Sequence, residues 1–150
     1  MTPILTKDFK DFIELLLKHK VDFLICGGHA VAFHGYPRLT MDFDILIKPS
    51  DENAGKLMIV LHEFGFGEAD IEKKLFTREG TAVTLGAQPN QIDLLTSCST
   101  QTTDKVFRNA VYGRLGEFNV LFISKEDLLR GKKEAGRQKD LADIEELGKI

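Results

Sequence analysis

The fold that we expect for this chain is decided by residues 21–48, VDFLICGGHAVAFHGYPRLTMDFDILIK. Their first part, VDFLIC, is apolar and too short for a helix. It stops at Gly27-Gly28, which predicts a buried strand that enters a tight turn. Their last part, MDFDILIK over residues 41–48, alternates between the two faces of an extended chain and predicts a second strand. A short helix over residues 29–34 is expected to return the chain from the first strand to an adjacent one.

Two further helices are expected on either side of this stretch. Apolar residues recur at three- and four-residue spacing over residues 6–19, which predicts an amphipathic helix with its apolar stripe toward the core. Thr6 is its expected N-cap. After the second strand, residues 49–51 interrupt the chain before a third helix, which Gly65 and Gly67 are expected to close.

The second half of the chain is expected to contain more strands and a helical tail. Short strands are predicted at residues 74–78, 81–85, 91–96, 110–114 and 118–123. The first two are expected to form one hairpin and the last two another, before a mostly helical tail that is interrupted near Gly136. Because helices and strands mix irregularly, the predicted fold class is α+β, a mixed sheet flanked by helices. We expect one domain over residues 1–150, with a core at 21–123 and the tail at 124–150.

The composition is that of an ordinary globular protein. Hydrophobic residues make up 43% of the 150 and charged residues 29%, which excludes the regime of disordered chains. We expect a cytoplasmic protein, because no apolar stretch approaches a membrane span and the first residues lack the pattern of a secretion signal. Cys26 and Cys98 form neither a disulfide framework nor a metal-binding spacing. The net charge of −3 hides a basic segment at residues 104–139, which is more often a solvated face than a phosphate-binding surface.

Three aspartates carry the chemistry that the residues suggest. In the strand over residues 41–48, Asp42 and Asp44 share one face, opposite to the apolar residues that alternate with them. Two such charges repel each other, and magnesium would compensate them; a strand with one solvated face is the other reading. Asp93 lies in another short apolar strand, where a buried unpaired charge is costly. If the two strands are neighbours, the carboxylates converge and could hold two metal ions, as in nucleotidyl transfer.

The Gly27-Gly28 turn meets a second requirement of such chemistry. Backbone N–H groups at a glycine turn can approach an anion closely, and the dipole of the following helix adds to the attraction. Most turns of this kind only reverse the chain. This turn gains weight from its position, one short helix before the acidic strand.

The chain resembles the polymerase-beta-like nucleotidyltransferase superfamily in three motifs taken as a set: Cys26-Gly27-Gly28, Asp42-Phe43-Asp44 and Ile92-Asp93-Leu94. Residues 35–40, GYPRLT, are similar to the small bacterial members, which include abortive-infection-type toxin and antitoxin nucleotidyltransferases. The resemblance covers residues 21–96, and a weaker similarity to the helical tail of those members covers residues 132–147.

The resemblance implies a nucleotidyltransferase-like fold and a magnesium-dependent enzyme that moves a nucleoside monophosphate from a triphosphate such as ATP to a hydroxyl, releasing pyrophosphate. It implies that Asp42, Asp44 and Asp93 are catalytic and bind two magnesium ions, and that Asp93 helps to deprotonate the acceptor. The nucleotide is then expected to contact Gly27, Gly28, Arg38, Thr40, Lys132 and Lys139. The acceptor is expected to be RNA such as tRNA, a protein or a small molecule, and a partner chain or homodimer is expected to help hold it.

Several of these assignments have a structural alternative. Arg38 and Thr40 could only stabilise the turn before the acidic strand. Lys132 and Lys139 could form salt bridges along an exposed helix. His29 stands where many members have serine, and it is either a phosphate contact or a structural residue. The alternative functions are a non-catalytic nucleotide-binding regulatory or antitoxin-like module and a plain interaction domain.

Overall fold

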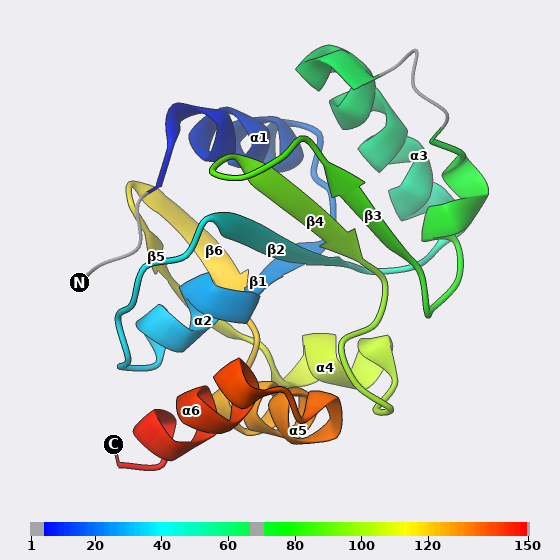
Figure 1. The fold of residues 1–150 in the computed structure, drawn as a ribbon. Helices are drawn as coiled ribbons and strands as arrows, with labels where there is room; N and C mark the ends of the chain where they lie inside the picture. Colours follow the sequence, from blue (N-terminus) through cyan, green and yellow to red (C-terminus); the bar gives the residue numbers. More distant parts are fainter. Residues whose placement is uncertain (1–4, 67–70, 150) are drawn as a thin grey trace.

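The computed structural model describes residues 5–66 and 71–149 of the chain. Within these ranges six strands form one mixed sheet, and six α-helices accompany it (Figure 1). The α+β class predicted from the sequence, a mixed sheet flanked by helices, is confirmed. None of the helices in the described ranges has the length and apolar character needed to cross a membrane.

The sheet has the order β3-β4-β2-β1-β6-β5. The strands are β1 (Phe23–Cys26), β2 (Asp42–Ile47), β3 (Ala82–Leu85), β4 (Gln91–Leu95), β5 (Val111–Leu115) and β6 (Phe118–Phe122). The helices are α1 (Lys7–Lys18), α2 (Gly27–Phe33), α3 (Asp51–Leu61), α4 (Thr103–Asn109), α5 (Lys125–Ala135) and α6 (Gln138–Leu147). β2 pairs with β4 in parallel and with β1 in antiparallel orientation, which places the acidic strand in the interior of the sheet.

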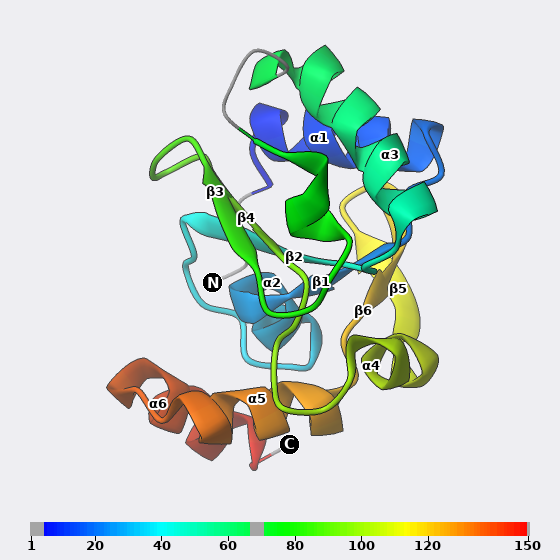
Figure 2. The ribbon, with the colours of Figure 1, turned by 90° about the vertical axis from the view of Figure 1, so that its right-hand side faces the viewer.

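The sheet lies between two groups of helices. α1 and α3 cover one face, whereas α5 and α6 lie on the other side (Figure 1, Figure 2). α1 contacts the core through fully buried side chains: Phe9, Phe12, Ile13 and Leu16. The ring of Phe9 stacks on that of Phe43 of β2, with centroids 4.8 Å apart. The prediction that this helix turns its apolar stripe toward the core is confirmed.

The helix beginnings predicted from the sequence are confirmed where a hydroxyl caps them. Thr6 accepts a hydrogen bond from the backbone N–H of Phe9 at the start of α1. Ser50 and Ser124 act in the same way at the starts of α3 and α5. The interruption of the tail lies at Gly136, whose left-handed conformation, with φ of 65°, ends α5.

Two other glycines also mark helix boundaries. α2 begins at Gly27, two residues earlier than expected, and its C-cap is His34. Gly65, with φ of 105°, leaves the helical conformation inside the turn His62–Phe66 that follows α3, close to where the sequence predicts the helix to close. Gly67, the second glycine expected to close that helix, lies outside the described residues.

Two predictions about the middle of the chain are wrong. Residues 74–78 are not a strand, because Lys73–Phe76 forms a short 3₁₀ helix anchored by the buried side chain of Phe76. The hairpin expected there does not form, and β3 pairs with β4 instead. α4 was not expected, because its seven residues are too few to show a helical period. Its start is held by tertiary contacts, including a hydrogen bond of 2.7 Å from the N–H of Thr103 to Oε1 of Glu79.

Candidate functional site

The three aspartates predicted as ligands lie on two neighbouring parallel strands. In the pairing of β2 with β4, Asp42 is opposite Gln91 and Asp44 is opposite Asp93. Side chains alternate between the faces of a sheet, so these four residues share one face, on strands about 4.8 Å apart. Phe43, between the two aspartates, is fully buried on the other face. The sheet thus brings Asp44 and Asp93 together from distant positions in the chain.

The neighbouring carboxylates affect the ionisation of Asp44. The pKa of Asp44 is raised to about 7, first by burial, then by a hydrogen bond with Asp93 and by the charges of Asp93 and Asp42, while Lys139 opposes the shift. A hydrogen bond between two carboxyl groups requires a shared proton. The pair therefore has a position at which either a proton or a metal cation is favourable.

Neutral side chains donate hydrogen bonds to the carboxylates of Asp93 and Asp42. Thr84 Oγ1 donates to Asp93 Oδ1 at 2.7 Å, and Gln91 Nε2 donates to Oδ1 at 3.2 Å and to Oδ2 at 3.0 Å. Gln88 Nε2 donates to Asp42 Oδ1 at 3.0 Å. These donors cannot be recognised in the sequence, because only the strand register shows which polar residues stand beside the aspartates.

The two glycines allow α2 to begin directly against the acidic strand. Gly27 has φ of 66°, and a Cβ atom added to it would overlap the carboxylate of Asp44. A Cβ atom on Gly28 would lie 2.8 Å from Oγ1 of Thr40. Thr40 Oγ1 in turn donates to the backbone carbonyl of Asp42 at 3.1 Å. Both glycines are therefore required for the close approach of this turn to β2.

A cavity of about 600 Å³ opens beside the carboxylates, between the sheet and the helices α5 and α6. It is lined by these predicted site residues: Gly27, Asp42, Asp44, Asp93, Lys132 and Lys139. The predicted residues Gly28, Arg38 and Thr40 do not line it. Its charged lining consists of five carboxylates and three cations, with Asp127, Asp140 and Arg137 completing the set. An anionic ligand would need an additional cation to enter this negatively charged space.

Lys132 and Arg38 are both engaged in a buried ion-pair cluster. Lys132 Nζ lies 2.8 Å from Asp143 Oδ2 and 3.3 Å from Asp140 Oδ1. Arg38 donates from Nε and Nη2 to the two carboxylate oxygens of Asp143, each at 2.9 Å. Burial opposes the ionisation of Asp143, but Arg38 and Lys132 outweigh it and hold the pKa of that carboxyl below its usual value. Salt bridging within the tail, the alternative considered for Lys132, is thus observed, although the lysine is buried and not exposed.

Lys139 and Arg137 stand at the start of α6, on the cavity wall. Lys139 is exposed and, among residues 5–66 and 71–149, has no carboxylate within ion-pair distance. Arg137 donates from Nε to Asp140 Oδ2 at 2.6 Å, and its side chain is 62% exposed. Lys139 is therefore the cation of this cavity that is available for a bound anion.

His29 takes part in the aromatic packing of the core. Its ring is buried and makes edge contacts with the rings of Phe9 and Phe43, at centroid distances of 6.0 and 5.1 Å. Burial lowers the pKa of His29 to about 4, with the charge of Arg38 adding to the effect, so the imidazole is neutral at physiological pH. His29 does not line the cavity beside the aspartates.

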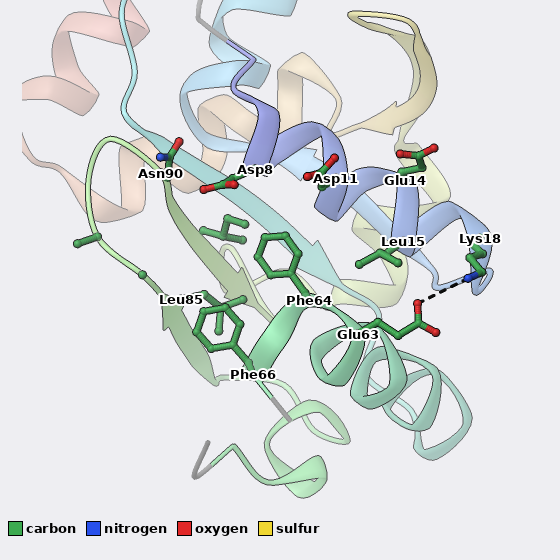
Figure 3. A pocket seen from close by; sticks show the side chains of 13 residues that line it. Asp8, Asp11, Glu14, Leu15, Lys18, Glu63, Phe64, Phe66, Leu85 and Asn90 are labelled. Atoms are coloured by element: carbon green, nitrogen blue, oxygen red, sulfur yellow. Dashed lines mark ion pairs between the residues drawn. The ribbon is translucent and has the colours of Figure 1, made fainter. Parts of the chain in front are cut away.

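A larger cavity, of about 770 Å³, lies between α1 and the turn that joins β3 to β4 (Figure 3). Ile92 lines it, whereas its neighbours Gln91 and Asp93 line the first cavity, so the two cavities lie on opposite faces of β4. Four acidic residues line it against one cation, Lys18, which already pairs with Glu63 at 3.7 Å. Both cavities carry a net negative charge, but the smaller one has three cations in its lining, among them Lys139. Of these two cavities, the smaller one is therefore the better candidate for an anionic ligand that binds with an additional cation.

The carboxylates of Asp42, Asp44 and Asp93 fit a magnesium ion that takes its remaining ligands from water and from phosphate groups. No three His, Cys, Asp or Glu side chains in the described ranges are arranged to hold a metal ion by themselves. Magnesium is commonly bound by one or two carboxylates, with water and substrate phosphates as its remaining ligands. The contact of Asp44 with Asp93, beside a turn that has no room for a Cβ atom, matches that requirement.

Comparisons with known proteins do not assign the chain to a family. A scan against protein-family models found no match, and a search of the curated proteins found none either. The resemblance to nucleotidyltransferases therefore rests on the three sequence motifs.

Proposed function

We propose that this protein is a magnesium-dependent nucleotidyltransferase, which transfers a nucleoside monophosphate from a nucleoside triphosphate to an acceptor hydroxyl. The observation that carries the proposal is the register of β2 and β4, in which Asp44 and Asp93 stand side by side. The cavity beside them supports it, because about 600 Å³ is within the usual range for a small-molecule site.

The proposed roles follow from the positions of the side chains. Asp44 and Asp93, with Asp42 beside them, are the residues that would hold two magnesium ions. When bound, magnesium would neutralise phosphate oxygens and stabilise the negative charge that develops on them. Gly27 leaves space for the triphosphate against the acidic strand, and Lys139 offers it a cation from the cavity wall.

Four further residues from the resemblance would act in or around the nucleotide site. Lys132 lines the cavity and contributes positive charge, while it holds two aspartates of the tail. Gly28 and Thr40 support the strand that carries Asp42. Arg38 fastens α6, and with it Lys139, beside the cavity. We propose these as supporting roles, because Gly28, Arg38 and Thr40 lie outside the cavity lining.

The reaction balances with these groups. The acceptor oxygen attacks the α-phosphorus and forms a new phosphoester bond, while the bond from that phosphorus to the bridging oxygen of the β-phosphate breaks. The pair of electrons leaves with pyrophosphate. The proton of the acceptor hydroxyl passes to water, and Asp93 would assist its loss by holding a magnesium ion that lowers the pKa of that hydroxyl. We propose that the acceptor is RNA such as tRNA, a protein or a small molecule, held with the help of a partner chain or second copy, in the cytoplasm.

A labelling experiment tests the proposal. The protein is incubated with α-labelled nucleoside triphosphates, magnesium and cell extract, and transfer of label to any acceptor is measured. The expected result is transfer by the unaltered protein and a loss of about 100-fold or more in Asp93→Asn. Asp11→Asn is the matched control, because Asp11 pairs with Lys7 on the surface, outside the proposed site. Absence of transfer, or equal transfer by Asp93→Asn, would reject catalysis at this site.

A second candidate function is that of a regulatory or antitoxin-like module, which binds a nucleotide but does not catalyse its reaction. It is favoured by the hydrogen bond from Gln88, which occupies Oδ1 of Asp42. Calorimetry separates the two functions. Tight magnesium-dependent nucleotide binding without pyrophosphate release over hours, in the presence of extract, favours this module, whereas release favours the enzyme.

A further inference from the structure

Two residues other than the three aspartates, Thr84 and Gln91, contact Asp93 from different sides. We infer that Thr84 and Gln91 are positioning residues, which fill both acceptor positions of Asp93 Oδ1 and one of Oδ2 and so leave one position of Oδ2 to ligate a metal ion. This inference rests on the proposed function, because it assigns a role to these residues only if Asp93 is a ligand.

The strand register explains how the two donors reach one carboxylate. Asp93 on β4 is opposite Thr84 on β3 and opposite Asp44 on β2, so it has a hydroxyl on one side and an acid on the other. Gln91 precedes Asp93 by two residues on the same face of β4. Asp93 is therefore fixed from its own strand and from the edge strand, while its remaining side adjoins Asp44.

The number of donors distinguishes the two oxygens of Asp93. Thr84 donates to Oδ1 at 2.7 Å, and Gln91 donates to Oδ1 at 3.2 Å and to Oδ2 at 3.0 Å. A carboxylate oxygen has about two lone-pair positions. Thr84 and Gln91 thus fill both positions of Oδ1 and one of Oδ2, and the hydrogen bond with Asp44 engages the position that a cation would take.

Hydrogen-bond partners of a ligating group set its orientation, and removing one commonly costs about 10- to 100-fold in metal affinity. Both donors here are neutral, so they orient Asp93 without adding a positive charge that would compete with the metal ion. Thr84 is exposed on the edge strand β3, and the loss of its hydroxyl is expected to cost little folding free energy. An effect of Thr84 on metal binding can therefore be separated from an effect on folding.

The experiment measures the Mn²⁺ affinity of the full chain by electron paramagnetic resonance, in the presence of a non-hydrolysable nucleoside triphosphate. Thr84→Val and Gln91→Met are each expected to weaken Mn²⁺ binding by about 10- to 100-fold. Thr84→Ser, which retains the hydroxyl, is expected to bind like the unaltered protein. The matched control is Thr100→Val, because Thr100 Oγ1 also donates to a carboxylate, Glu134 Oε2 at 2.9 Å, on an exposed part of the surface.

The outcomes separate this inference from the proposed function. If the unaltered protein binds Mn²⁺ and Asp93→Asn does not, unchanged affinity in Thr84→Val and Gln91→Met overturns the positioning role alone. An equal loss in Thr84→Val and Thr84→Ser also overturns it, since the hydroxyl would then not be responsible. If the unaltered protein binds no Mn²⁺, the proposed function and the inference both fail. Thermal unfolding of each variant shows that it is folded before its affinity is compared.

Discussion

Gly27 has a backbone conformation and an environment that no other residue type can occupy without change. Its φ of 66° is in the left-handed region, and a Cβ atom would overlap the carboxylate of Asp44. We predict that Gly27→Ala lowers the free energy of unfolding by more than the roughly 1–2 kcal/mol that the backbone conformation alone costs. Urea unfolding measures the difference.

Gly80 provides the control for this prediction. It also has a positive φ, of 88°, but nothing lies within 4 Å of a Cβ atom added to it. Gly80→Ala should therefore lower the free energy of unfolding only by the amount that the backbone conformation costs. Equal losses in Gly80→Ala and Gly27→Ala would mean that the contact of Gly27 with Asp44 does not constrain the site.

The raised pKa of Asp44 predicts a pH dependence of stability in the metal-free protein. Because its pKa in the folded state, about 7, exceeds its usual value of 3.8, the protonated form stabilises the fold. This contribution, on the order of a few kcal/mol, is complete below pH 4 and is lost as the pH rises through 7. Asp44→Asn should remove it, which unfolding curves between pH 4 and 8 measure. Parallel pH profiles for the two proteins would contradict the assignment.

At the scale of single residues, the sequence indicates which side chains are chemically unusual but not what contacts them. The alternation of residues 41–48 correctly predicts that Asp42 and Asp44 share a face. Nothing in the chain indicates that Thr84 and Gln91 hold Asp93, because that requires the register of three strands. The burial of Lys132 is equally hidden, since its partners Asp140 and Asp143 become neighbours only when α5 and α6 pack together.

Among the elements, α6 is held to the domain by ion pairs that its sequence does not reveal as buried. Asp143 accepts hydrogen bonds from Arg38 and contacts Lys132, and its side chain is 3% exposed. We predict that Asp143→Ala costs about 3–5 kcal/mol in unfolding free energy, because it leaves two cations without this partner. Urea unfolding measures the loss.

The surface pair of Lys7 and Asp11 is the control for this prediction. Its side chains are 85% and 42% exposed, so Asp11→Asn should cost less than about 1 kcal/mol. A loss in Asp143→Ala as small as that in Asp11→Asn would show that the buried cluster does not fasten α6.

The elements that the sequence predicts correctly are those with a strong local signal. α1 has both a helical period and a capping threonine, and the hairpin of β5 and β6 has two apolar runs around a short turn. Residues 74–78 lack such a signal, because their few apolar residues fit a strand or a helical turn equally well, and burial of Phe76 selects the turn. α4 is likewise determined by contacts of Thr103 with other segments.

Across the whole molecule, the two large cavities differ in the charges that they present to a ligand. The cavity beside α1 has acidic walls and a single, already paired lysine (Figure 3), whereas the cavity beside the aspartates is lined in part by the tail, which carries Lys139. We propose that the cavity beside the aspartates binds a triphosphate together with divalent cations. This claim depends on the sheet, which joins the glycine turn, β2 and β4, and on the tail that packs across them.

The most direct test of this claim is a crystal structure of the protein with a non-hydrolysable nucleoside triphosphate and Mn²⁺, whose anomalous scattering locates the metal. The account predicts Mn²⁺ coordinated by Asp44 and Asp93, with the phosphate groups beside Gly27. A nucleotide bound outside this cavity, or Mn²⁺ that contacts neither aspartate, would contradict it.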